Sequence, residues 1–186
     1  MRESDSSSLS LAGSILIAHP SLLDPNFRKT VLFLATNTAQ GGSFGFVLNR
    51  PAGYTVADFL PDPDLGKLGE IPVFIGGPVE SDTLIFASFR WDSQSKKMEC
   101  QHHLQLDEAQ SALATHMSIV RAFKGYAGWS NGQLGAELAQ SAWLVSRPVR
   151  EILRVGRSAT IWRETISAFG PWYRLVAEAP EDPSRN

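Results

Sequence analysis

Short apolar runs, each ended by Gly, Pro or a group of polar residues, recur along most of the chain. Such runs predict buried β-strands, because β-branched and aromatic residues favour strands whereas Pro and Gly interrupt them. The ranges expected to form strands are 14–19, 30–35, 43–48, 73–75, 84–89, 98–106, 119–125 and 143–146. The connection at 36–42 is rich in Gly, so the second and third of these strands are expected to pair as an antiparallel hairpin.

One of these ranges, 98–106, alternates between apolar and polar positions. One face carries Met98, Cys100, His102, Leu104 and Leu106, and the other carries Glu99, Gln101, His103 and Gln105. The first face is the more apolar, so it is expected to point inward. This register predicts that the thiol of Cys100 is buried and reacts slowly with thiol reagents until the protein unfolds.

Apolar residues spaced three or four apart predict helices between the strands. The expected ranges are 55–60, 107–117, 133–140, 149–153 and 158–169, the last of them ended by Gly170-Pro171. Thr55 is expected to cap the first helix. Asp107, with Gln110 three residues later, is an acidic relative of the capping box and is expected to begin the second helix, with Leu113 and Met117 on one stripe.

Together these elements predict an α+β fold with a mixed, mostly antiparallel sheet. Strands outnumber helices, and they occur both in a hairpin and in front of helices, which disfavours a doubly wound sheet. At 186 residues the chain is expected to form one domain with a sizeable core. The polar ends, residues 1–8 and 178–186, are expected to be disordered, so the domain is placed at 9–177.

Composition narrows the class of protein. The hydrophobic content of 43% indicates a globular chain, and the net charge of -2 argues against binding nucleic acid by bulk electrostatics. The single cysteine, Cys100, excludes an internal disulfide and a Cys-rich zinc site. The apolar stretch 9–18 is short and lacks a basic lead, and no run is long enough to span a bilayer. We therefore expect a cytoplasmic protein that does not contact membranes.

The stretch from Lys124 to Leu134 is the most distinctive in the chain. Three Gly residues and two aromatic residues follow an apolar strand and precede a helical pattern. It is expected to form a strand-to-helix turn in which Ser130 or Asn131 caps the helix. A turn of this kind points backbone N–H groups at whatever lies in front of it, which makes it a candidate binding element.

Three other stretches also combine turn-forming residues with polar ones: 20–27, 45–51 and 76–79. Together with Gly125-Tyr126-Ala127-Gly128-Trp129 and Gly132-Gln133-Leu134, they occur in an order that resembles the AlgH/YqgE family of bacterial proteins. The resemblance covers residues 13–171. It implies a compact domain with a small barrel-like sheet surrounded by helices. The family's function is mostly unassigned, one branch carries a transcriptional-regulator label, and no catalytic residues can be carried over.

The four motifs could form a pocket for a small anion. Arg50 offers a bidentate fork, the turn at Gly128 offers N–H donors, and Trp129 or Tyr126 offers a stacking face. The residues that such a pocket would use are Asp24, Asn26, Asn49, Arg50, Gly76, Gly77, Tyr126, Gly128, Trp129 and Gln133. In the alternative, the motifs meet only to pack, with Trp129 buried and Arg50 paired inside the protein with a carboxylate such as Asp24.

No motif for a cofactor or for established catalytic chemistry occurs in the sequence. Strand alternation separates His103 from Cys100 and His102, so these three residues are not expected to bind a metal. The Gly-x-x-Gly at 125–128 lacks the helices and basic residues of an RNA-clamping loop. No metal and no cofactor are therefore expected.

These observations favour a non-enzymatic cytoplasmic protein that is regulatory or senses a small anionic ligand. The alternative is an unrecognised enzyme that acts on a phosphorylated or carboxylated metabolite through Arg50, Asp24 and Asn26. Direct DNA binding is the least favoured hypothesis, because no predicted helix has the density of Lys and Arg that a recognition helix needs. The identity of a ligand or partner and the oligomeric state stay open.

Overall fold

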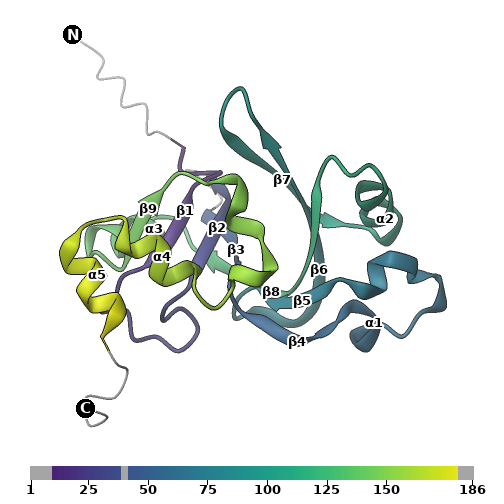
Figure 1. Ribbon diagram of the computed structural model, residues 1–186, viewed down its shortest axis with the longest axis horizontal. Helices are drawn as coiled ribbons and strands as arrows, with labels where there is room; N and C mark the ends of the chain where they lie inside the picture. The colour runs from purple at the N-terminus through teal and green to yellow at the C-terminus, as the bar shows by residue number, and fades with distance from the viewer. Residues whose placement is uncertain (1–9, 39–41, 180–186) are drawn as a thin grey trace.

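Nine strands form one sheet within residues 10–38 and 42–179, the part of the chain that the computed structural model describes (Figure 1). The strands are β1 (Ile15–Ala18), β2 (Val31–Thr38), β3 (Gly42–Val47), β4 (Pro51–Thr55), β5 (Pro72–Ile75), β6 (Val79–Asp92), β7 (Lys97–Leu104), β8 (Ile119–Trp129) and β9 (Trp143–Ser146). The helical elements are α1 (Val56–Phe59), η1 (Pro63–Glu70), α2 (Leu106–Ala114), α3 (Gln133–Ala139), η2 (Arg150–Leu153), η3 (Val155–Arg157), α4 (Ile161–Ser167) and α5 (Pro171–Glu178), where η marks a 3-10 helix.

Strand β8 connects the two halves of the sheet. Its first part pairs antiparallel with β6 and parallel with β5, and its last three residues pair antiparallel with β3. From β3 the sheet continues through β2 and β1 to β9, while β7 is added beyond β6 and β4 beyond β5. The single parallel pair, β5 with β8, makes the sheet mixed and mostly antiparallel, as predicted. The predicted β2–β3 hairpin is also confirmed, although residues 39–41 of its connection lie outside the described residues.

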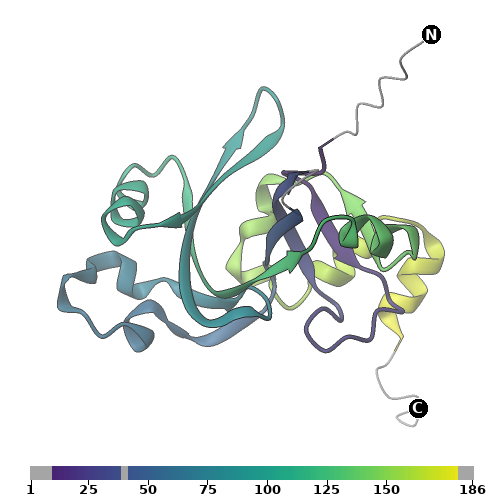
Figure 2. The ribbon, with the colours of Figure 1, turned by 180° about the vertical axis from the view of Figure 1, so that it is seen from behind.

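Contact between Phe33 of β2 and Phe89 of β6 shows that the sheet is curled. The two ring centroids are 5.3 Å apart, although β3 and β8 separate these strands in the sheet. Residues on non-adjacent strands can meet in this way only on the concave face of a bent sheet. The predicted barrel-like portion is therefore an open half-barrel, whose curvature is visible in Figure 2.

Helical segments cover both faces of the half-barrel. The concave face packs against Ile152, Ile161 and Trp162 of the C-terminal segment, and the indole of Trp162 donates to the Ala18 carbonyl over 2.9 Å. In Figure 1 this segment, drawn in pale green and yellow, lies in front of β1 and β2. On the convex side, α1, η1 and α2 cover one half of the sheet, and α3 covers the other half through Leu134.

The predicted helix boundaries are partly wrong. Thr55 is the N-cap of α1, as predicted, and its backbone N–H donates to Asp58 over 2.8 Å. Helix α2 begins one residue before Asp107. Its N-cap is Gln105, whose backbone N–H donates to Glu108. Leu106 is therefore helical instead of the last residue of a strand. Met117 lies beyond the helix end and is 73% exposed.

The stretch from Lys124 to Leu134 also differs from the prediction. Strand β8 continues through it to Trp129, so the expected strand-to-helix turn at Gly125 to Gly128 is absent. The N-cap of α3 is Gly132, at a φ of 78°, in place of Ser130 or Asn131. Gly125 is required within this strand because its φ is 67° and an added Cβ would lie 2.6 Å from the Gly77 carbonyl oxygen.

Four elements are additional to the prediction: the strand β4, the helix α5 and the 3-10 helices η1 and η3. Strand β4 contains Pro51 and Gly53, two residue types that disfavour strands, so the sequence pattern does not predict it. It pairs with β5 as an edge strand. Helix α5 follows Gly170 because Pro171 occupies its first turn, where the missing N–H costs little. The predicted disordered range 1–8 and residues 180–186 of the predicted disordered range 178–186 lie outside the described residues, whereas Glu178 is the last residue of α5. No helix in the described ranges is long and apolar enough to cross a membrane.

Candidate functional site

Asn49 and Arg50 fasten the loop that precedes β2. The side-chain amide of Asn49 donates to the Lys29 carbonyl over 3.0 Å and accepts from the Val31 backbone N–H over 2.8 Å. Nη1 of Arg50 donates to the Asn26 carbonyl over 2.6 Å, and its Nη2 donates to the Arg28 carbonyl over 3.0 Å. Both terminal nitrogens of Arg50 therefore hold the protein's own backbone.

Asp24 shapes the same loop instead of forming an ion pair with Arg50. Its carboxylate accepts from the Asn26 backbone N–H over 2.7 Å, and its carbonyl accepts from the N–H groups of Phe27 and Arg28. Partial burial lowers the pKa of Arg50, and the charge of Asp24 opposes that shift. Asp24 and Asn26 are exposed, so their recorded contacts are those of a turn.

Gly76 and Gly77 allow the end of β5 to pass directly over β8. A Cβ atom added at Gly76 would lie 2.2 Å from the Gly125 carbonyl oxygen, and one at Gly77 would lie 2.1 Å from the backbone of Tyr126. No side chain fits at these distances. The Gly76 carbonyl also accepts from the Val47 N–H over 2.9 Å, which ties the crossing to β3.

Trp129, the last residue of β8, is buried against α3 and β9. The indole N–H groups of Trp129 and Trp143 both donate to Oε2 of Glu137, each over 2.8 Å. Oε1 of Glu137 accepts from Nε2 of Gln133, whose own Oε1 accepts from the Ser130 N–H. The aromatic and polar residues of this motif are thus bonded to one another.

The four motifs therefore form one connected set of contacts. Phe27 joins the loop held by Arg50 to the ring of Trp129, with 6.3 Å between the ring centroids. Tyr126 stays partly exposed and packs on Phe44, whereas Gly128 is exposed beside the Tyr126 ring. These contacts explain the residue types by packing and turn geometry. Anion binding by these residues stays a prediction.

A different part of the molecule has the form of a ligand site. The half-barrel stays open between β7 and β9, which pair only with β6 and β1, respectively, within the described chain. A cleft of about 630 Å³ lies at this opening and is called the seam cleft. Its lining residues are Ser10, Ala12, Gly13, Ser14, Phe33, Ala35, Ser95, Lys96, Lys97, Met98, Glu99, Cys100, Arg147 and Pro148.

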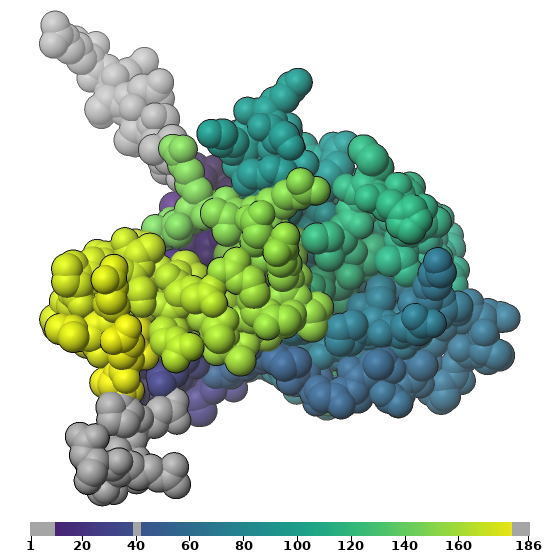
Figure 3. All heavy atoms as spheres, viewed as in Figure 1, coloured from purple at the N-terminus to yellow at the C-terminus, as the bar shows by residue number. Residues whose placement is uncertain are grey.

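The seam cleft combines an apolar floor with a basic rim. Phe33 and Met98 belong to the concave core and are almost fully buried. Lys96, Lys97 and Arg147 are exposed at the rim, and no carboxylate of the described chain forms a recorded ion pair with them. In Figure 3 the β6–β7 hairpin, in teal, stands apart from the green segment after β9, with purple N-terminal atoms between them.

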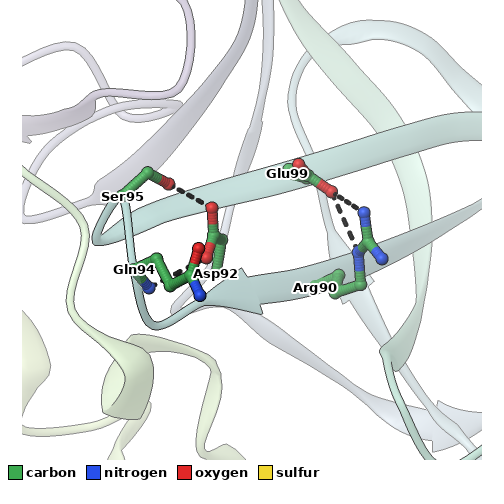
Figure 4. A network of polar contacts seen from close by, with 5 residues as sticks. All are labelled: Arg90, Asp92, Gln94, Ser95 and Glu99. Atoms are coloured by element: carbon green, nitrogen blue, oxygen red, sulfur yellow. Dashed lines mark hydrogen bonds and ion pairs between the residues drawn. The ribbon is translucent and has the colours of Figure 1, made fainter.

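The turn that carries Lys96 and Lys97 is held by its own polar network (Figure 4). Asp92 accepts from the Ser95 hydroxyl and from the Gln94 N–H, and these hydrogen bonds lower the pKa of Asp92. On the opposite strand, the carboxylate of Glu99 accepts from Nε of Arg90 over 2.9 Å. The one carboxylate that lines the cleft is thus already paired, which leaves the field at the rim positive.

Cys100 lies on the inward face of β7, as the alternation predicted, but it is half-buried instead of fully buried. Burial raises the pKa of its thiol to about 12. The thiol is therefore protonated near neutral pH and is a poor nucleophile. In the seam cleft it acts as part of the apolar wall.

The prediction that strand alternation separates the side chain of His103 from that of His102 is wrong. The register between β6 and β7 shifts between Ala87 and Phe86, and His103 takes a left-handed conformation with a φ of 58°. This bulge brings Nδ1 of His103 to 2.8 Å from Nδ1 of His102, and both rings pack on Phe44. Burial, followed by the charge of His103, lowers the pKa of His102. No group of three or more metal-ligating side chains occurs among the residues that the structure describes.

Comparison with known proteins places the chain among relatives without a named activity. A family model described as AlgH-like matches residues 15–174. A UPF0301 protein of Chlorobium luteolum is 35% identical over 182 residues, with 94% of each chain covered. A UPF0301 protein of Mycobacterium leprae is 33% identical and covers 94% of this chain and 90% of its own.

Two solved structures share the fold. The solution structure of the AlgH protein from Pseudomonas aeruginosa superposes with a TM-score of 0.62 at 28% identity, covering 98% of this chain and 100% of that one. A crystal structure of a protein from Corynebacterium diphtheriae gives a TM-score of 0.71 at 20% identity, covering 90% and 92%. The second likeness concerns the fold alone.

Proposed function

The chain belongs to the AlgH-like family, whose compared members carry no named activity, and we propose that it is a non-enzymatic binding protein whose seam cleft takes a small amphipathic anion. In this proposal it works in the cytoplasm as a ligand-responsive, regulatory protein. The site that supports binding is the seam cleft and not the four sequence motifs, because the terminal nitrogens of Arg50 are engaged with backbone carbonyls.

One observation carries this proposal: an apolar floor lies directly beneath three cations that form no ion pair within the described residues. The volume of about 630 Å³ falls in the usual range for small-molecule sites. Phe33 and Met98 would contact an apolar body, while Lys97 and Arg147 would face a carboxylate or phosphate group. Exposed cations alone bind anions weakly, so the apolar contact must supply much of the affinity.

Binding is favoured over catalysis by the chemistry of the cleft lining. The thiol of Cys100 is the strongest potential nucleophile there, and its raised pKa of about 12 keeps it protonated. The carboxylate of Glu99 is held by Arg90, so it is poorly placed to act as a general base. The described lining contains no His or Asp that could take this role.

The proposal is tested by mapping a probe onto the native chain by NMR. Decanoate, a ten-carbon carboxylate, is titrated into the protein and followed through its backbone amide signals. We expect saturable shifts at residues 12–14, 95–100 and 147. Decanol, which has the same apolar body without the charge, is the matched ligand and is expected to bind more weakly.

Chain length provides a second arm of the same experiment. Each buried methylene contributes about 0.8 kcal/mol, so decanoate, with two more methylenes, is expected to bind up to about fifteenfold more tightly than octanoate. Shifts that centre on Arg50 and Trp129 would show that the ligand binds at the four motifs and not in the seam cleft. Shifts that do not saturate at any residue would remove the binding proposal, and turnover of a bound metabolite would replace it by the enzymatic alternative.

A further inference from the structure

Arg121 is a charged residue inside the core of the half-barrel. It lies on β8 with 2% of its surface exposed. Its Nη2 donates to the carbonyl of Leu153 in η2. Its Nε and Nη1 are fully buried, and no group in the described ranges accepts a hydrogen bond from either.

This arrangement is costly unless another group completes it. Burial lowers the pKa of Arg121 to about 10, which leaves the guanidinium charged at neutral pH. The centroid of the Phe74 ring lies 4.2 Å from the central guanidinium carbon of Arg121, and the ring stabilises the charge from one face. The N–H groups point outward in the plane of the guanidinium, so the ring cannot accept their hydrogen bonds. Burying donors of a charged group without an acceptor is strongly unfavourable, because they lose their hydrogen bonds to water and gain none in the protein.

The surroundings of Arg121 favour a small negative group. Ala87 is registered directly opposite Arg121 on β6, so the neighbouring side chain is short. Residues 149–157 are called the covering segment. This segment contacts the guanidinium because the Leu153 carbonyl accepts its hydrogen bond. Exposed basic side chains, Arg150 and Arg154, flank Leu153 on this segment. Their positive field raises the local concentration of anions around the covering segment.

We propose that Nε and Nη1 of Arg121 bind a small monovalent anion, a halide ion or a single carboxylate group, beneath the covering segment. A monovalent anion matches the one charge of the guanidinium, whereas a dianion would leave an uncompensated charge in the core. This interior site uses different residues from the seam cleft. The inference therefore does not depend on the proposed function.

Anomalous diffraction from crystals of the full chain grown with sodium bromide tests the site directly. We expect a bromide peak within hydrogen-bond distance of Nε or Nη1 of Arg121, and no peak there in Arg121→Met. Ordered water molecules on both nitrogens, with no bromide, would overturn the inference. A peak that persists in Arg121→Met would identify an adventitious ion only and would also overturn it.

Urea unfolding gives an independent readout in solution. The unfolding midpoint of the wild-type protein is compared in potassium chloride and in potassium gluconate at equal ionic strength, because gluconate is too bulky for the core. We expect a higher, saturable midpoint in chloride for the wild type and for Arg163→Met, which removes an exposed cation outside the covering segment. The chloride effect is expected to disappear in Arg121→Met.

If Arg121→Met does not fold, Arg121→Lys takes its place, because it keeps the charge but has no Nε or Nη1. Its chloride effect is expected to be reduced severalfold. An equal midpoint in both salts for the wild type, or the same chloride effect after either substitution, would contradict the inference.

Discussion

The indole nitrogen of Trp129 donates to Oε2 of Glu137 over 2.8 Å, and this bond ties the end of β8 to α3. The same oxygen also accepts from the indole of Trp143 at the start of β9. Both rings are at least 95% buried, so one carboxylate satisfies two donors that have little access to water. The most distinctive stretch of the sequence is thereby explained as a joint between three elements.

Removing that carboxylate is expected to cost stability. Glu137→Leu leaves two buried indole donors without an acceptor, and we expect the free energy of unfolding to fall by about 2–5 kcal/mol. Glu137→Gln keeps an acceptor oxygen and is expected to lose less, about 1–2 kcal/mol. Urea unfolding followed by tryptophan fluorescence measures both. A loss below about 0.5 kcal/mol for Glu137→Leu, equal to that of the exposed control Glu178→Gln, would show that the joint contributes little.

Two glycine substitutions are expected to change stability in opposite directions. Gly77→Ala places its Cβ about 2.1 Å from the backbone of Tyr126, so we expect a loss of at least about 3 kcal/mol or failure to fold. Gly135→Ala lies in α3 with nothing within 4 Å of the added atom, and it is expected to gain about 0.5–1 kcal/mol. Thermal unfolding of the pair measures the difference. Tolerance of Gly77→Ala would contradict the close crossing of β5 and β8.

Cys100 is expected to resist labelling in the native protein. Its pKa of about 12 and its place on the inward face reduce the thiolate that a chromogenic disulfide reagent needs. We expect labelling to be at least about a hundredfold slower than after unfolding. The matched control is Gln101→Cys in a Cys100→Ser background, which places the thiol on the exposed face. Rapid labelling of native Cys100, with a slow control, would mean that the register of β7 is shifted by one residue.

His102 is expected to make the protein less stable in acid. The pKa of His102 is lower in the folded protein than its usual value of 6.5 in the unfolded chain. As the pH falls from neutral through 6.5, the unfolded chain therefore takes up a proton at His102 before the folded protein does. The free energy of unfolding therefore falls as the pH falls through this window. His102→Gln is expected to reduce that fall, whereas the exposed control His116→Gln is expected to keep it. Urea unfolding at pH 7.5 and pH 5.5 measures the change, and identical pH dependence in all three proteins would refute the assignment.

The strands could be predicted because their apolar content is high and their ends are marked by Gly and Pro. The same signals misled elsewhere. Gly125 and Gly128 indicated a turn, although Gly125 lies in the close crossing with Gly77. Gly170-Pro171 correctly predicts the end of α4, but the pattern does not predict that Pro171 also begins α5. The bulge at His103 depends on pairing with β6, which the local pattern does not record.

The seam cleft could not be predicted, because its lining comes from segments that are far apart in the sequence. Lys97, Phe33 and Arg147 meet only because the sheet curls. Arg121 gave no signal either, since a lone basic residue in a strand usually points to solvent. Arg50 is predicted either to face an anion or to pair with a carboxylate such as Asp24, whereas its terminal nitrogens donate to backbone carbonyl groups.

The central claim is that the seam cleft binds an anion through its basic rim. The most direct test is the calorimetric affinity of decanoate for a rim variant, Lys97→Gln with Arg147→Gln, and for a matched control, Lys67→Gln with Arg163→Gln. Both variants remove two exposed cations, so they change the net charge equally.

We expect the rim variant to bind about tenfold more weakly than the wild type, because each lost charge contact contributes up to about 1 kcal/mol. The control is expected to bind like the wild type. Equal affinity in all three proteins, or an equal loss in the rim variant and the control, would contradict the account.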